Sequence, residues 1–252
     1  MILAHREVDA HLESLTGSFP ADCVIMGYDF SNSDLRWYKF PRTTFANCNF
    51  YNADLTESRF IGCVFDTCAM GRIRARQTQF VNSRFESCNL CDSILSQADL
   101  SQAEMVGCLT VDSDWTDVNL SKATLWNCIL SKRIAPTLLT GAFGSDTKFM
   151  MCDMEGVDLE RSHMFVSTFS MCDAKHSLWN SCRLEGAVFK RSNLGRSFFQ
   201  RAELKSCSFD SSDLEFANFR ESDLYNCDFA ESDTFGLNTS DCTMQHCYGW
   251  ED

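Results

Sequence analysis

Residues 212–224 read SDLEFANFRESDL and contain three copies of one five-residue unit. Each unit has a small residue, then an acid or amide, then a large apolar residue and two variable positions. The large apolar residues are Leu214, Phe219 and Leu224. A five-residue period fits neither an α-helix nor a flat β-strand. We therefore expect a chain that turns a corner once per repeat, with the small and the large side chains facing inward.

The same spacing continues through most of the chain. Of the 21 phenylalanines, 15 fall in the column of large apolar residues, far more than an even spread over the five positions would place there. The column slips by one position between Leu130 and Phe149 and then resumes. Because protein interiors pack at crystal density, a small side chain beside a large one suits a narrow interior. Among the predicted core residues are Phe50, Leu55, Phe209, Leu214 and Phe219.

The unit resembles the pentapeptide-repeat protein family, whose pattern is A(D/N)LXX. Clear matches are Ala53–Leu55, Ala98–Leu100 and Ser192–Leu194, and the resemblance covers roughly residues 25–235. It implies an all-β fold, a right-handed quadrilateral parallel β-helix or solenoid. Each coil of that fold holds four repeats, or about 20 residues.

The chain is expected to divide into four segments. Residues 1–22 form an N-terminal cap, because apolar residues between Ile2 and Leu15 predict a short amphipathic helix over the first coil. A first repeat stack follows at 23–132, a register-shift loop at 133–148, and a second stack with a C-terminal cap at 149–252. Tyr248 and Trp250 are the candidate capping residues at the far end.

The 15 cysteines are expected to fill the interior rather than form disulfides. With 20 residues per coil, three columns of inward thiols result, and Cys91 alone points outward. The columns are Cys48, Cys68, Cys88, Cys108 and Cys128; Cys152 and Cys172; and Cys207, Cys227 and Cys247. Stacked parallel side chains give poor disulfide geometry, so a reducing compartment is expected.

The net charge of −13 argues against nucleic acid as a direct partner, because duplex binding requires cations that neutralise phosphates. It suits solubility or a partner with a basic surface. The sequence shows no signal peptide and no membrane-spanning segment. We expect a bacterial cytoplasmic protein. Export as an effector without a cleaved signal is the alternative.

Outward acids recur every 20 residues in the second half of the chain. Asp153, Asp173, Asn193, Asp213 and Asp233 form this row. One interpretation is that these residues bond to local backbone and solvate the wall. The functional interpretation is an acidic stripe that imitates the phosphate line of a nucleic acid. A second candidate for partner binding is a local basic cluster, Arg72, Arg74 and Arg76.

No catalytic constellation is found, and no cofactor is expected. The five histidines share no spacing with a nucleophile, and a filled interior leaves no cavity for a substrate. The resemblance implies a protein-binding rod that mimics DNA, binds DNA gyrase or topoisomerase IV and protects it from quinolones or toxins. A monomer or weak dimer is expected, because the C-terminal module through which such proteins dimerise has no counterpart here. The alternatives are a bacterial effector, a protein-interaction module without mimicry, and a spacer.

Overall fold

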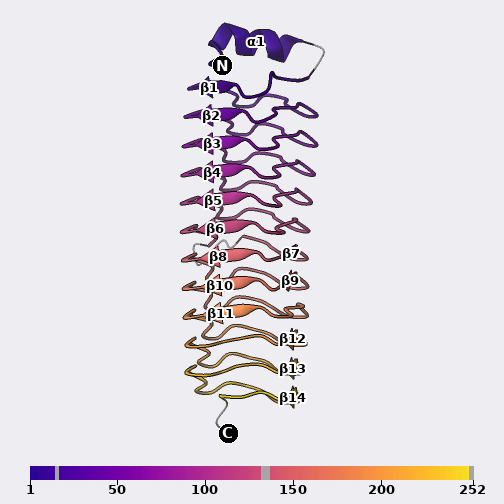
Figure 1. Cartoon of the computed structure of the whole chain (residues 1–252), viewed down its shortest axis with the longest axis vertical. Helices are drawn as coiled ribbons and strands as arrows, with labels where there is room; N and C mark the ends of the chain where they lie inside the picture. The colour runs from indigo at the N-terminus through magenta and orange to yellow at the C-terminus, as the bar shows by residue number, and fades with distance from the viewer. Residues whose placement is uncertain (15–16, 132–136, 250–252) are drawn as a thin grey trace.

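The computed structural model describes residues 1–14, 17–131 and 137–249. They form a long parallel β-solenoid with one short helix across its N-terminal end (Figure 1). The chain winds around the rod in coils of four five-residue repeats, so that residues 20 apart lie on the same wall of neighbouring coils. This confirms the all-β solenoid predicted from the repeat.

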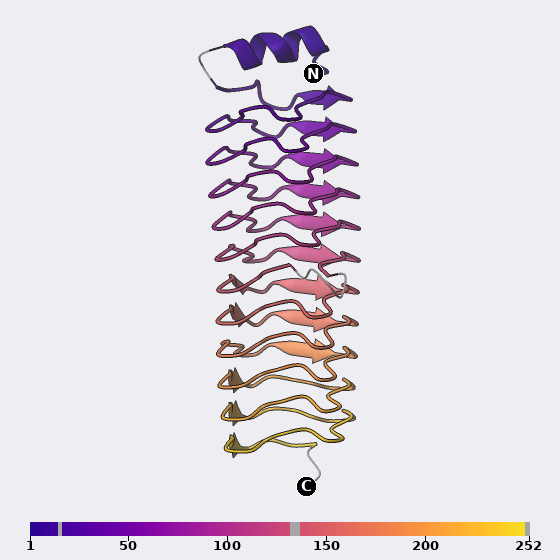
Figure 2. The ribbon, with the colours of Figure 1, turned by 180° about the vertical axis from the view of Figure 1, so that it is seen from behind.

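We call the large apolar residue of each repeat its central residue and number the walls by these residues in one coil. Phe45 lies on the first wall, Phe50 on the second, Leu55 on the third and Phe60 on the fourth. The first wall carries a nine-stranded parallel sheet within the described residues (Figure 2). Its strands are β1 (Val24–Met26), β2 (Thr44–Ala46), β3 (Val64–Asp66), β4 (Arg84–Glu86), β5 (Glu104–Val106), β6 (Thr124–Trp126), β8 (Lys148–Met150), β10 (Thr168–Ser170) and β11 (Val188–Lys190).

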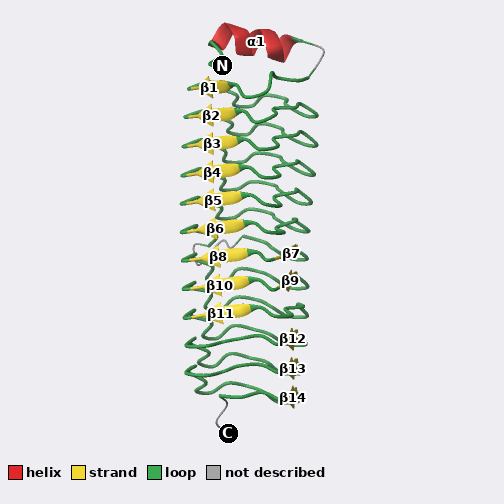
Figure 3. Cartoon of the chain, in the orientation of Figure 1, coloured by secondary structure: helices red, strands yellow, loops and turns green. Residues whose placement is uncertain are grey.

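The fourth wall carries the remaining strands of the described chain, along a different edge of the rod (Figure 3). They are β7 (Phe143–Ser145), β9 (His163–Phe165), β12 (Glu203–Lys205), β13 (Asp223–Tyr225) and β14 (Thr243–Gln245). All strands are three residues long, because each wall must end at a corner after one repeat. Isolated parallel bridges continue the pairing on the walls between them.

The register slip is a local insertion within one continuous stack. Strand β6 pairs directly with β8, with Leu125 opposite Phe149, so this coil is longer than the regular ones by four residues. The extra residues enter between Leu130 and Thr137, whose N–H donates to the Leu130 carbonyl oxygen at 2.9 Å as in a regular corner. The segment expected to be a register-shift loop, 133–148, instead contains β7 and the first residue of β8. Residues 132–136 lie outside the described part.

The corners have a backbone conformation that the repeat pattern did not reveal. Two positions after each central residue, φ is positive, between 48° and 65° for the non-glycine residues. This left-handed region is uncommon for side chains other than Gly, Asn and Asp. The solenoid nevertheless places arginines, methionines and Val166 there. The hydrogen bonds between coils impose the corner, whatever residue occupies it.

The interior is a set of stacked columns. The following predicted core residues are at most 2% exposed: Phe50, Leu55, Cys68, Cys88, Cys108, Phe209, Leu214 and Phe219. Phe45 and Phe65 stack with ring centroids 5.1 Å apart, and Phe65 and Phe85 at 4.8 Å. Neighbouring columns meet edge-on, as Phe189 does with Phe199 at 6.0 Å. Offset stacking and edge-to-face contacts are the favoured aromatic geometries. The columns therefore stabilise the rod along its axis and across it.

Helix α1 (His5–Glu13) covers the first coil, as predicted. Val8 of this helix is fully buried. Tyr28 and Tyr38 occupy positions that hold small inward residues in lower coils. Their hydroxyls donate to the Asp9 carboxylate at 2.5 Å and to the Leu12 carbonyl oxygen at 2.7 Å. Large side chains fit there because no coil lies above them, and they fasten the helix to the stack.

The last described coil is less covered than the first. Leu237, Met244 and Cys247 are only partly buried. The predicted cap residue Tyr248 is 56% exposed, and its backbone extends the first wall by a bridge to Asp228. Trp250, the other predicted cap residue, lies outside the described residues. The described part of the chain contains no helix with the length and hydrophobicity needed to span a lipid bilayer.

Candidate partner-binding surface

The acids of the repeat have a structural role that fixes their direction. At each of the four candidate acids one carboxylate oxygen accepts a hydrogen bond from the backbone N–H two residues later. Asp213 accepts from Glu215 at 2.8 Å, and Asp153 accepts in the same way from Glu155 at 3.2 Å. Such Asx turns suit Asp and Asn at chain corners. The turn uses one oxygen and holds the carboxylate on the outer surface of the wall.

The four candidate acids form one row on the second wall. Parallel bridges join Asp153 to Asp173, Asp173 to Asn193, Asn193 to Asp213, and Asp213 to Asp233. Because each bridge spans one coil, successive side chains lie about 4.8 Å apart along the rod. We call Asp153, Asp173, Asp213 and Asp233 the acidic stripe. Asn193 is the neutral position within it.

The stripe keeps its negative charge largely unbalanced. No ion pair in the described part of the chain reaches any of its four carboxylates. Burial raises the pKa of Asp153, and the negative charges of Asp173 and Glu155 raise it further. The Asx bond from Glu155 opposes this rise, because it favours the ionised carboxylate. At Asp153 the neighbouring negative charges therefore oppose ionisation, and a cationic partner would favour it.

Several charges elsewhere on the rod are paired between coils. Arg84 lies 2.5 Å from Glu104, one coil below it. Arg183 and Glu203 approach to 3.2 Å, and Arg201 and Glu221 to 2.6 Å. Exposed pairs of this kind contribute little stability, but they cancel the local field. Within the described residues, the four stripe carboxylates take no part in such pairs.

The predicted basic cluster is divided between two walls and partly neutralised. Arg72 lies at the corner after the second wall, 3.6 Å from Asp92 and over the ring of Tyr51 at 5.9 Å. Arg74, on the third wall, pairs with Asp54 at 3.2 Å. Arg76 is exposed on the same wall. Acids from the coils above and below neutralise two of the three arginines.

Apolar side chains continue the column of the stripe toward the N-terminus. Bridges join Leu109 to Ile129, and Ile129 to Asp153. Around the adjoining corner Trp126, Met151 and Met171 are 45%, 47% and 49% exposed. We call the following residues the apolar corner: Val106, Leu109, Trp126, Ile129, Met150, Met151 and Met171. The apolar corner was not predicted from the sequence. The available signal was apolar residues at outward repeat positions on both sides of the insertion.

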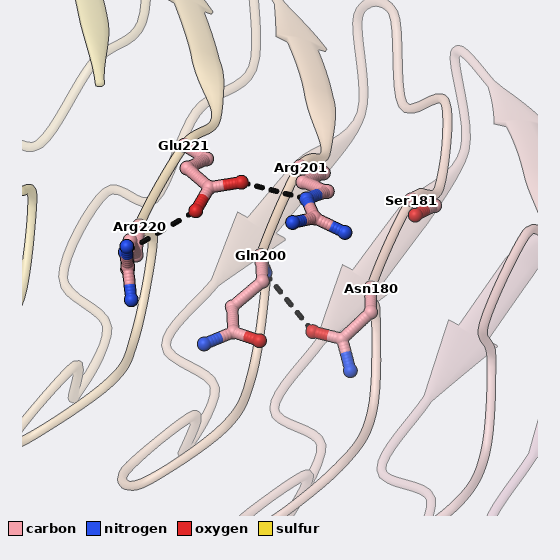
Figure 4. Close-up of a pocket in the computed structure, with 6 residues that line it drawn as sticks. All are labelled: Asn180, Ser181, Gln200, Arg201, Arg220 and Glu221. Carbon is pink, nitrogen blue, oxygen red and sulfur yellow. Dashed lines mark hydrogen bonds and ion pairs between the residues drawn. The ribbon is translucent and has the colours of Figure 1, made fainter. Parts of the chain in front are cut away.

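A polar hollow of about 210 Å³ lies on the third wall (Figure 4). Its lining is Asn180, Ser181, Gln200, Arg201, Arg220 and Glu221. Glu221 bridges Arg201 at 2.6 Å and Arg220 at 3.3 Å, and the Gln200 N–H donates to the Asn180 side-chain oxygen at 3.0 Å. The hydrogen bond and charge of Arg201 lower the pKa of Glu221. Ion pairs and hydrogen bonds between coils therefore hold the side chains that line the hollow, and its acid is suited to remain ionised.

The interior thiols form a longer column than the sequence predicted. Because of the insertion, Cys152 lies one coil below Cys128, so the first two predicted columns are one. Each thiol donates to a carbonyl oxygen of the coil above, as Cys88 does to Phe65 at 3.3 Å. None of the 15 cysteines forms a disulfide, and Cys91 is partly exposed, as its outward position predicts. Among the described residues, no cluster of His, Cys, Asp or Glu is arranged to hold a metal ion.

The sequence profile described as pentapeptide repeats matches the chain in 8 copies. The matched residues are 29–66, 76–109, 182–215 and 199–233. They lie on both sides of the insertion. No curated protein sequence matches the chain.

Three solved structures illustrate what the chain is similar to. A pentapeptide repeat protein of the Arabidopsis thaliana thylakoid lumen is 22% identical, covers 40% of this chain and 68% of its own, and has a TM-score of 0.36. HetL from the cyanobacterium Nostoc sp. strain PCC 7120, involved in heterocyst differentiation regulation, is 19% identical over 96% and 94%, with a TM-score of 0.24. Full-length QnrB1, a plasmid-mediated fluoroquinolone resistance protein, is 17% identical over 90% and 93%, with a TM-score of 0.25.

Proposed function

We propose that this chain, which belongs to the pentapeptide-repeat family, is a non-catalytic rod that binds a positively charged protein surface through its acidic stripe. The observation that carries the proposal is the row Asp153–Asp173–Asp213–Asp233, whose carboxylates follow one another along a single wall and have no ion-pair partner in the described chain. A row of like charges has an energetic cost that a basic partner offsets.

The spacing of the stripe supports a narrower proposal, DNA mimicry. Its carboxylates repeat at about 4.8 Å along the rod, and phosphates on one DNA strand repeat at about 3.4 Å. A protein surface that contacts a phosphate line with flexible Lys and Arg side chains can also contact this row. We therefore propose DNA gyrase or topoisomerase IV as the partner, with protection from quinolones or toxins as the outcome. This requires a bacterial cytoplasmic location.

The second candidate is a protein-interaction module without mimicry, including a bacterial effector. The observation that favours it is the cross-coil pairing of charge on the other walls, as between Arg183 and Glu203. Duplex DNA presents charge on all sides, whereas this rod presents its unbalanced row on one wall. A partner with a single basic ridge can pair with this row as well as the concave basic surface of a DNA-binding protein can.

The test is a gyrase supercoiling assay with purified protein at micromolar concentration, with and without a quinolone. We expect altered supercoiling or quinolone protection, and retention of gyrase subunits by the immobilised protein. The matched variant is Asp173→Asn with Asp213→Asn, because Asn keeps the Asx bond and removes only the charge. Loss of the effect in this variant would support the acidic stripe as the binding site for gyrase. No effect and no retention with the wild-type protein would exclude gyrase mimicry.

A further inference from the structure

The apolar corner and the acidic stripe are parts of one column on the rod. Leu109 and Ile129 are followed directly by Asp153 and Asp173 in the same series of parallel bridges. The change from apolar to acidic occurs between the two coils that the insertion joins. Side chains of the two kinds therefore lie in adjacent coils, about 4.8 Å apart.

The exposed apolar residues are contiguous. Trp126 pairs in register with Met150, so their side chains lie together on the outer surface of the first wall. Met151 and Met171 occupy equivalent corners of adjacent coils. Isolated exposed apolar residues are ordinary, but contiguous ones mark interaction surfaces. Trp and Met are also enriched at protein interfaces, where Met adapts to the shape of its partner.

We propose that the apolar corner and the acidic stripe together form one docking surface for a basic helical segment of a partner protein. The inference rests on the proposed function and specifies its partner. Apolar side chains at one end of the segment cover Trp126 and Met151, and Lys or Arg residues along the rest pair with Asp173, Asp213 and Asp233. Charge complementarity selects this occupant, because anionic lipid or nucleic acid would be repelled by the unpaired carboxylates.

The spacing favours a helix over an extended chain. One turn of α-helix advances about 5.4 Å, close to the coil spacing of about 4.8 Å, whereas alternate residues of a strand lie about 6.6–6.8 Å apart. Basic residues three or four positions apart advance about 4.5–6.0 Å, so that successive cations reach successive coils, of which that of Asn193 offers an amide in place of a carboxylate. From the coil of Trp126 to that of Asp233 the surface spans about 24 Å, which is about 16 helical residues.

The probe is a fluorescein-labelled synthetic peptide of about 18 residues, which spans about 27 Å as a helix. It carries Lys at every fourth position through two thirds of its length and Leu and Trp on the same face of the remaining third. A scrambled peptide of identical composition is its control. Binding to the full chain is measured by fluorescence anisotropy at two salt concentrations. We expect the ordered peptide to bind at least tenfold more tightly than the scrambled one.

Variants separate the two halves of the surface. Trp126→Ala should weaken binding of the ordered peptide by at least tenfold, as truncation of an interface anchor does, with an unchanged salt dependence. Asp173→Asn with Asp213→Asn should weaken binding and reduce the salt dependence. Tyr225→Ala and Glu185→Gln alter exposed residues of the fourth wall and should leave the affinity within twofold. Thermal unfolding confirms that each variant is folded.

The outcomes distinguish this inference from the function on which it rests. If the double Asp variant loses binding and Trp126→Ala does not, the acidic stripe binds its partner without the apolar corner, and the composite surface is refuted. If neither variant weakens binding, both proposals fail. Equal binding of the scrambled peptide also overturns the inference, since it would show that total charge alone is recognised.

Discussion

The backbone N–H of Asp153 donates a 3.0 Å hydrogen bond to the carbonyl oxygen of Cys128, on the other side of the insertion. The same bond in a regular coil joins Asn89 to Cys68, a pair that is closer in sequence by four positions. The pairing of this wall therefore continues through the irregularity without a break. This single relationship extends the thiol column and aligns the acidic stripe with the apolar corner.

Deletion of residues 133–136 should leave the solenoid intact, because the coils on both sides already pair in regular geometry. The shortened connection would match the two-residue corners elsewhere. We expect an unchanged circular dichroism spectrum and a Tm within about 4 °C of the wild type, equivalent to about 1 kcal/mol. The matched control is deletion of residues 211–214, which removes the core residue Leu214 and shifts every later coil. An equal loss of thermal stability in both deletion variants would contradict the interpretation that four residues are inserted into an otherwise regular coil.

Phe209 should be among the residues most important for stability. Its ring lies between those of Phe189 and Phe229, each at a centroid distance of 5.1 Å. Phe209→Ala should reduce the free energy of unfolding by about 3–5 kcal/mol, because a buried cavity remains. Phe209→Asp should prevent cooperative folding, because it buries an unpaired charge. Phe235→Ala, at a position 67% exposed, should change stability by about 0.5 kcal/mol or less. Denaturant titration measures all three, and a Phe209→Asp protein with wild-type stability would refute the inward assignment.

Two acids at the same repeat position should affect stability in opposite directions. The pKa of Asp153 is raised above 3.8 in the fold, so its ionised form destabilises the fold at neutral pH. Asp153→Asn should therefore raise the Tm at pH 7 by about 1–2 °C, the scale of a surface substitution. The gain should disappear as the pH falls below 3.8, where Asp153 is protonated in both states.

Asp54 provides the contrast to Asp153. Its pKa is lowered, because hydrogen bonds from Thr56 and Arg74 and the charge of Arg74 outweigh its burial. Its stabilising contribution is present above pH 3.8 and is lost as the pH falls through the lower folded pKa. Asp54→Asn should thus lower the Tm at pH 7. Thermal unfolding between pH 3 and pH 7 tests both variants, and shifts of the same sign would contradict the assignment.

The interior thiols should be protected from reagents. Cys91, Cys242 and Cys247 are partly exposed, and the other 12 cysteines are buried. Burial raises the pKa of the Cys63 thiol to about 12 and also raises that of Cys182. Because the thiolate is the reactive form, these residues should be inert. Brief maleimide labelling followed by mass spectrometry should modify no more than 3 thiols in the native protein and all 15 after unfolding. Rapid labelling of Cys108 in the native protein would show that the thiol column is not buried in the interior.

Inward and outward assignment could be made from sequence because it is a local property of each repeat. Phe50, Leu55 and Phe209 are buried whatever coil they belong to, since every repeat turns one corner and directs the same positions inward. The terminal helix was also predictable from its apolar spacing. The left-handed corners were not, because residues as different as Val166 and Arg201 occupy them. Hydrogen bonds between coils dictate that conformation, and residue type does not reveal it.

The sequence by itself determined the period, the filled interior and the recurrence of outward acids. Only the tertiary structure decided which outward residues are neighbours. Ile129 meets Asp153, and Cys128 lies above Cys152, because one coil closes four positions later than the others. Neighbours on a wall are set by coil closure, a long-range relation that a five-residue repeat does not encode. The candidate surface depends on that closure, because its apolar and acidic parts come from opposite sides of the insertion.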